Sequence, residues 1–175
     1  MRYYLLNWEE TGNPVPRIRN WMDRLDYQAV QKKEISKLPE RTILLLEENS
    51  DTLFSDVIEI PFLLVSKMFW DVSKMYGVPA KGKEMVLLDG VNGFAEIYYM
   101  PVFPKYECLS DKTVFNNDYS MIRKLILDKN KIKNAPPAFT VSEVEKEYLI
   151  CRLDFVESIL RRGAKGMKLT ELQIE

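Results

Sequence analysis

The chain has 175 residues and a formal net charge of −1, and 46% of its residues are hydrophobic. Such a composition is typical of a folded domain with a sizeable core. The balanced charge argues against nucleic acid as a direct ligand, because phosphate binding needs concentrated positive charge. No apolar run approaches the ~20 residues that span a bilayer, and the first residues, MRYYLLNWEETG, do not resemble a secretory signal. We therefore expect a cytoplasmic protein without a membrane partner.

The first third of the chain alternates between apolar runs and breakers. Residues 3–8, YYLLNW, predict a strand, and the TGNPVPR that follows predicts a loop. Residues 20–39 have no clear periodicity. Residues 42–48, TILLLEE, predict a buried strand, and residues 55–61 predict a further strand that ends at Pro61.

A short amphipathic helix is predicted after Ser66, which is suited to cap the helix with its hydroxyl group. Gly77 and Pro79 are expected to end this helix. Its predicted apolar face consists of Phe69, Val72, Met75 and Tyr76.

The remaining elements follow from the same kind of pattern. Residues 83–103 predict two strands joined by a tight turn, because Asp-Gly and Asn-Gly both occur between them. Further strands are predicted within 106–115, 122–132 and 147–150. Residues 153–162 predict a second helix, and residues 167–174 predict a last strand.

The two predicted helices lie in similar stretches, SKMFWDVSKMYGVPAKG (66–82) and ICRLDFVESILRRGAKG (150–166). An offset of 86 aligns Gly77 with Gly163 but sets Lys74 against Leu160. An offset of 84 keeps both apolar faces and aligns the two Ala-Lys-Gly triplets, so we prefer it. It predicts that eight residues face a sheet: Phe69, Val72, Met75, Tyr76, Leu153, Val156, Ile159 and Leu160.

This repeat predicts an α+β fold in which two amphipathic helices pack on a mostly antiparallel sheet. We expect one domain over residues 1–175, with an N-terminal strand region (1–54) and a core that contains the repeat (55–175). Cys108 and Cys151 are the only cysteines, and in a cytoplasmic protein we expect both to be buried thiols.

Several stretches resemble a bacterial family, namely PFLLVSKMFWDV, RKLILDKNKI, PAFTVS and EYLICRLDFVESILRRGAKGMKLTEL. They are similar to immunity proteins of polymorphic toxin systems, of the immunity protein 11 type (domain of unknown function 1629). Leu64, Val65 and Ser66 match the first helix entry of that family, whereas Leu149 and Ile150 occupy the second entry without its serine. The resemblance covers residues 55–172. It implies a protein that binds and neutralises a cognate toxin and catalyses no reaction.

Two features of the sequence could bind such a partner. Trp70 falls on the polar side of the first helix, where an exposed tryptophan would be a typical hot spot. The alternative is that Trp70 widens the buried face, as large aromatic residues commonly do. Glu47, Glu48 and Asp51 lie at a strand end, where acidic side chains could steer a basic toxin.

The sequence offers little for catalysis. It has no histidine, no Gly-x-Ser-x-Gly and no complete phosphate loop. We therefore predict no catalytic residue, no metal site and no cofactor. Two alternatives to an immunity protein stay open: a regulatory or phage-derived interaction module, and a hydrolase that uses a pair of carboxylates from the acidic clusters.

Overall fold

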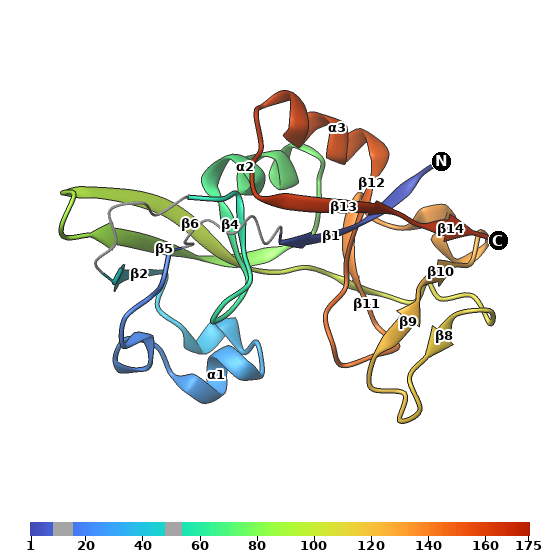
Figure 1. The fold of residues 1–175 in the computed structure, drawn as a ribbon, viewed down its shortest axis with the longest axis horizontal. Coiled ribbons are helices and arrows are strands. Elements are labelled where there is room, and N and C mark those ends of the chain that lie inside the picture. The colour runs from blue at the N-terminus through green and yellow to red at the C-terminus, as the bar shows by residue number, and fades with distance from the viewer. Residues whose placement is uncertain (9–15, 48–53) are drawn as a thin grey trace.

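The computed structural model describes residues 1–8, 16–47 and 54–175. Its strands form mixed, mostly antiparallel sheets, which confirms the predicted α+β class. Within the described residues the α-helices are α1 (Tyr27–Gln31), α2 (Lys67–Met75) and α3 (Leu153–Arg161). Short 3-10 helices lie at Trp21–Asp23, Ile35–Lys37 and Lys131–Asn134. Figure 1 shows α2 and α3 on the same side of the molecule, above the two main sheets.

The first sheet has the order β2-β5-β6-β4-β3. Its strands are β2 (Arg41–Leu45), β3 (Val57–Ile58), β4 (Leu64–Ser66), β5 (Lys81–Asp89) and β6 (Phe94–Val102). β2 runs parallel to β5, and the other pairs are antiparallel. The predicted hairpin is confirmed: the Asp89 carboxylate accepts hydrogen bonds from the backbone N–H groups of Val91 (3.0 Å) and Asn92 (2.9 Å) in its turn.

The second sheet has the order β13-β1-β12-β11-β7. Its strands are β1 (Tyr3–Trp8), β7 (Lys105–Tyr106), β11 (Ala138–Val141), β12 (Leu149–Arg152) and β13 (Met167–Glu171). Two small sheets pair β8 (Val114–Phe115) with β9 (Ile122–Lys124), and β10 (Ile126–Leu127) with β14 (Gln173–Ile174). The strands predicted within 106–115 and 122–132 are therefore only short pieces, whereas the predicted bounds of β1 are confirmed.

Helix α2 begins and ends where the sequence predicted. The Ser66 hydroxyl accepts a hydrogen bond from the Phe69 N–H (3.2 Å), which confirms it as the cap of α2. Gly77 follows α2 with φ of 66°, and Gly163 follows α3 with φ of 80°. Both glycines lie in the left-handed region that other residues rarely adopt, so they end the two helices in the same way.

The repeat is real, but the offset of 84 is wrong. The helices and their glycines correspond at an offset of 86, since Lys67–Met75 matches Leu153–Arg161. Met75 and Leu160 are 65% and 47% exposed, so they do not face a sheet as predicted. The buried positions are Phe69, Trp70, Val72 and Ser73 in α2, and Phe155, Val156, Ser158 and Ile159 in α3.

The repeat extends to whole strands. We define the first unit as β3, β4, α2, β5 and β6, and the second unit as β11, β12, α3, β13 and β1. In each unit the strands have the same order and the same antiparallel pairing, with β1 in the place of β6. The register agrees: Tyr98 and Tyr99 lie opposite Ser66 and Val65, and Tyr3 and Tyr4 lie opposite Arg152 and Cys151. The last strand of the second unit thus comes from the beginning of the chain.

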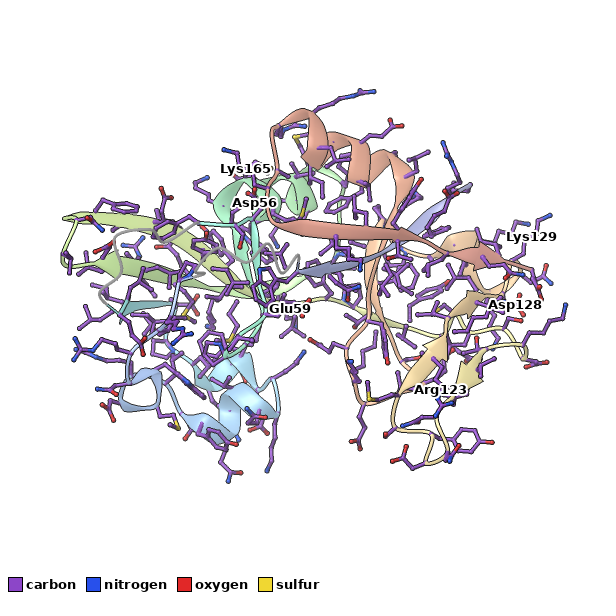
Figure 2. All side chains as sticks on the ribbon, in the orientation of Figure 1. Asp56, Glu59, Arg123, Asp128, Lys129 and Lys165 are labelled. Carbon is purple, nitrogen blue, oxygen red and sulfur yellow. The ribbon has the colours of Figure 1, made fainter. Side chains whose placement is uncertain are left out.

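Equivalent parts of the two units meet. The rings of Phe69 and Phe155, which are equivalent, lie 5.4 Å apart in an edge-to-face contact inside one shared core. Such contacts between equivalent residues are typical of a two-fold relation. A second link joins Asp56 and Lys165, which are labelled next to one another in Figure 2. The Asp56 N–H donates to the Lys165 carbonyl (2.9 Å), and the Asp56 carboxylate accepts from the Lys165 N–H (2.7 Å).

Candidate protein-interaction surface

One face of the first sheet carries apolar side chains that are exposed to solvent. Ile43, Val86 and Ile97 lie opposite one another on β2, β5 and β6, and Leu45, Leu88 and Ala95 form the next row. We call these six residues the open sheet face. Ile43 is 53% exposed, Leu45 43% and Ile97 37%. Contiguous exposed apolar residues of this kind are typical of sites for protein partners.

The opposite face of the same strands is buried. Leu44, Met85 and Leu87 are fully buried and pack with Ala29 and Val30 of α1. Burial therefore alternates along β2, so the strand that was predicted as buried is buried on one face only. Figure 1 shows α1 below this sheet and α2 above it. The β5–β6 hairpin extends to the left, beyond the end of α2. Because α2 covers only the near end of the hairpin, the rows beyond it are left exposed.

The candidate acidic residues lie at the end of this surface. Glu47 has the same parity on the strand as Arg41, Ile43 and Leu45, and all four are exposed. Glu47 therefore continues the open sheet face with a negative charge. Glu48 and Asp51, the other two acidic candidates, lie outside the described residues.

Trp70 is not the exposed anchor that the helix pattern suggested. Its side chain is only 8% exposed, and its ring stacks on Tyr99 at 5.0 Å and 12°. The Lys74 ammonium lies 4.3 Å above the Trp70 ring. Gly82 leaves room for the indole, since a Cβ there would lie 2.7 Å from Trp70 Cη2. The prediction of an exposed Trp70 is therefore wrong, and its alternative, burial, is confirmed.

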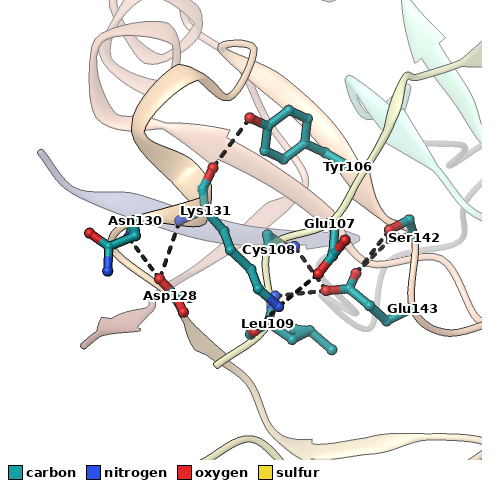
Figure 3. Close-up of polar contacts among 9 residues, drawn as sticks. All are labelled: Tyr106, Glu107, Cys108, Leu109, Asp128, Asn130, Lys131, Ser142 and Glu143. Atoms are coloured by element: carbon teal, nitrogen blue, oxygen red, sulfur yellow. Dashed lines mark hydrogen bonds and ion pairs between the residues drawn. The ribbon is translucent and has the colours of Figure 1, made fainter. Parts of the chain in front are cut away.

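Glu143, the first residue of the acidic stretch at 143–147, makes hydrogen bonds that hold the fold together. Figure 3 shows the Glu143 carboxylate accepting from the backbone N–H groups of Cys108 (2.9 Å) and Leu109 (2.8 Å). Lys131 donates to the Leu109 carbonyl (3.0 Å) and forms an ion pair with Glu107 (2.9 Å). These contacts tie the segment after β7 to the β11–β12 loop. The Glu143 carboxylate is therefore a structural hydrogen-bond acceptor.

The titratable groups that shift most are buried ones. Burial, together with the smaller effect of the nearby Glu143 carboxylate, raises the pKa of the Cys108 thiol to about 12. Burial likewise raises the pKa of the Cys151 thiol. Both cysteines are free, as expected, and both are protonated at neutral pH. A protonated, buried thiol is a poor nucleophile.

Two further observations concern metals and membranes. Among the residues that the structure describes, no group of three or more Asp, Glu or Cys side chains is placed to hold a metal ion. No helix in the described ranges is long and apolar enough to cross a membrane.

Comparisons with known proteins add no family assignment. None of the protein-family models matches the sequence, and the search of curated proteins gave no match. The resemblance to immunity proteins consequently remains a hypothesis, which the open sheet face can be used to test.

Proposed function

We propose that this protein is a non-enzymatic, cytoplasmic binding protein that neutralises a cognate bacterial toxin by covering part of the toxin with the open sheet face. The observation that carries the proposal is the pair of apolar rows on β2, β5 and β6, in which Ile43 is 53% exposed. The family resemblance supplies the class of partner, and the sheet face supplies a surface suited to it.

The surface has the composition of a protein-binding site. A specific interface commonly buries about 1,600 Å² in total, with an apolar centre and a polar rim. The open sheet face offers the apolar centre. Glu47 and the ion pair between Arg41 and Glu84 lie at its two ends along the strands. A negative charge at the rim would speed association with a basic partner without adding much affinity.

The proposal can be tested by co-expression with the toxin domain encoded beside this gene. Wild type should restore growth and bind the toxin, whereas Ile43→Asp combined with Ile97→Asp should weaken binding about 30-fold or more, as expected for hot-spot positions. Met121→Asp is a matched control, because Met121 is also an exposed apolar residue (44%) but lies before β9. Failure of wild type to rescue growth would contradict the toxin partner.

The rim charge gives a second, smaller readout. Glu47→Lys should slow association with a basic toxin, and the difference from wild type should shrink as salt is added. Unchanged binding in the double variant and in Glu47→Lys would contradict the proposed surface. A regulatory or phage-derived interaction module would use the same surface, but its complex would form without rescue from a toxin.

A further inference from the structure

The turn that joins β5 to β6 contains the only Asn-Gly pair in the sequence, Asn92-Gly93. Both residues are exposed, and the turn lies at the end of the hairpin that reaches beyond α2 (Figure 1). Gly93 has a φ of 69°, in the left-handed region, so the turn needs a glycine at this position. The hairpin therefore depends on a dipeptide that is prone to deamidation, because glycine leaves the backbone nitrogen after asparagine unhindered.

Deamidation of such a pair needs only water. The backbone nitrogen of Gly93 loses its proton and attacks Cγ of Asn92, which closes a succinimide ring and releases the side-chain nitrogen as ammonia. Water then opens the ring at either carbonyl and leaves aspartate or isoaspartate at position 92. The reaction requires that the Gly93 nitrogen can lose its proton and that the Asn92 side chain is free to turn towards it.

Asp89 restrains both groups that take part in this reaction. Its backbone carbonyl accepts a hydrogen bond from the Gly93 N–H (3.0 Å). Its carboxylate accepts from the Asn92 N–H (2.9 Å) and from the side-chain amide of Asn92 (2.7 Å). The Asn92 amide is thus held against Asp89, and hydrogen bonds to a charged acceptor are strong ones. The negative charge beside the turn also opposes the loss of a proton from the Gly93 nitrogen.

The Asp89 carboxylate is itself fixed and ionised. Asp89 is only 3% exposed at the end of β5, and the hydrogen bonds from the backbone and the side chain of Asn92 hold its pKa below the usual range. An ionised carboxylate is a poor target for attack by a backbone nitrogen. Asp89-Gly90, in which the same kind of ring could form, is therefore protected by the contacts that restrain Asn92.

We propose that Asn92 is a deamidation site that Asp89 protects in the folded protein. Opening of the turn then limits the rate at which Asn92 is lost. The product damages the turn, because a carboxylate at position 92 faces the Asp89 carboxylate in place of the amide, and like charges so close together repel. The reaction is chemistry of the turn alone, so it does not depend on the proposed function.

The test is the rate of deamidation in the whole protein at neutral pH. It is followed by mass spectrometry of the proteolytic peptide that contains Asn92 and by an assay for isoaspartate. Folded wild type should react at least about tenfold more slowly than the same chain unfolded in urea, since one hydrogen bond to a charged acceptor changes an equilibrium by about that factor. Equal rates in the folded and the unfolded chain would overturn the proposal.

Two variants assign the protection to Asp89. Asp89→Ala removes the carboxylate and should raise the rate at Asn92 about tenfold or more in the folded protein. Gly90→Ala is the matched control in the same turn, because a Cβ there meets no atom within 4 Å, and it should react at the wild-type rate. Circular dichroism and the melting temperature verify that both variants are folded. A wild-type rate in Asp89→Ala, or an equal acceleration in Gly90→Ala, would overturn the proposal as well.

Discussion

The two units share a scaffold but differ in what they expose. Each has a strand, a helix that ends at a left-handed glycine, and a pair of antiparallel strands in the same order. In the first unit, β5 and β6 are nine residues long, whereas β13 and β1 have five and six. The extra length carries Val86, Leu88 and Ile97 beyond the helix. In the second unit the chain leaves the sheet after Glu171, and β14 pairs with β10 instead.

This difference distinguishes the parts of the chain that form the shared core from the parts that form the exposed apolar surface. The repeated parts form the shared core, in which the packed helices cover both units. The unrepeated parts, β2 and the far end of the hairpin, form the open sheet face. A feature that one unit needs only for folding should occur in both, so the additional apolar rows are the better candidates for a function outside the fold.

The largest expected effect comes from breaking the contact between the units. Phe155→Ala removes a fully buried ring that packs against Phe69 and Tyr76, and it should reduce the free energy of unfolding by about 3–5 kcal/mol. Leu160→Ala, on the exposed side of the same helix, should change it by less than about 0.5 kcal/mol. Urea unfolding followed by tryptophan fluorescence and by circular dichroism should give one coincident transition. Two separate transitions in wild type would contradict a shared core.

A smaller loss of stability is expected from a substitution next to Trp70 in the first unit. Gly82→Ala places a Cβ 2.7 Å from Trp70 Cη2, so the indole must shift off Tyr99, at a cost of about 1–3 kcal/mol. Gly90→Ala is the control, because a Cβ there meets no atom within 4 Å. Thermal unfolding measures both variants. Equal stability in the two would show that the contact between Gly82 and Trp70 is unimportant.

Changes at the first residues of α2 and α3 should produce a smaller difference in stability between the two units. Ser66→Ala removes the hydroxyl that caps α2 and should cost about 1 kcal/mol. The equivalent residue in the second unit, Arg152, makes no side-chain cap bond to α3 and instead pairs with Asp154. Arg152→Ala should therefore cost less than Ser66→Ala in the same denaturation experiment. The reverse order would contradict the conclusion that only the Ser66 side chain caps its helix.

The last difference is absent at neutral pH and should appear only at alkaline pH. The pKa of Cys108 is raised in the folded state, so burial of the neutral thiol contributes stability that is full below the unfolded pKa, near 9, and is lost as pH rises towards about 12. Between pH 9 and 11, wild type should lose more unfolding free energy than Cys108→Ala, which cannot titrate there. Parallel pH profiles for the two proteins would contradict this assignment.

The sequence predicted the fold class, both helices, the Ser66 cap and the long hairpin, because each depends on local patterns. The offset of the repeat was missed for a physical reason. Positions 74 and 160 are exposed in the folded protein, so the mismatch between Lys74 and Leu160 carried no information, whereas the glycines at 77 and 163 did. The shared Ala-Lys-Gly was misleading: Lys81 begins β5, while Gly166 precedes β13.

The candidate surface was harder to find. Residues 42–46 are apolar at nearly every position, so no alternation reveals that Ile43 and Leu45 face solvent. Trp70 was misplaced because its burial depends on Tyr99 and Gly82, which lie on other elements. Only the repeated Tyr-Tyr of residues 3–4 and 98–99 could have indicated that β1 completes the second unit.

The position of β1 has a consequence for biosynthesis. Tyr3–Trp8 leaves the ribosome long before its neighbours Leu149–Arg152 and Met167–Glu171 exist, so its backbone donors and acceptors must wait for nearly the whole chain. Residues 57–102 can meanwhile assemble from contacts close in sequence, which favours early formation of the first unit. Until residues 149–171 have emerged, the nascent chain should therefore carry an unpaired apolar strand that needs shielding from other chains.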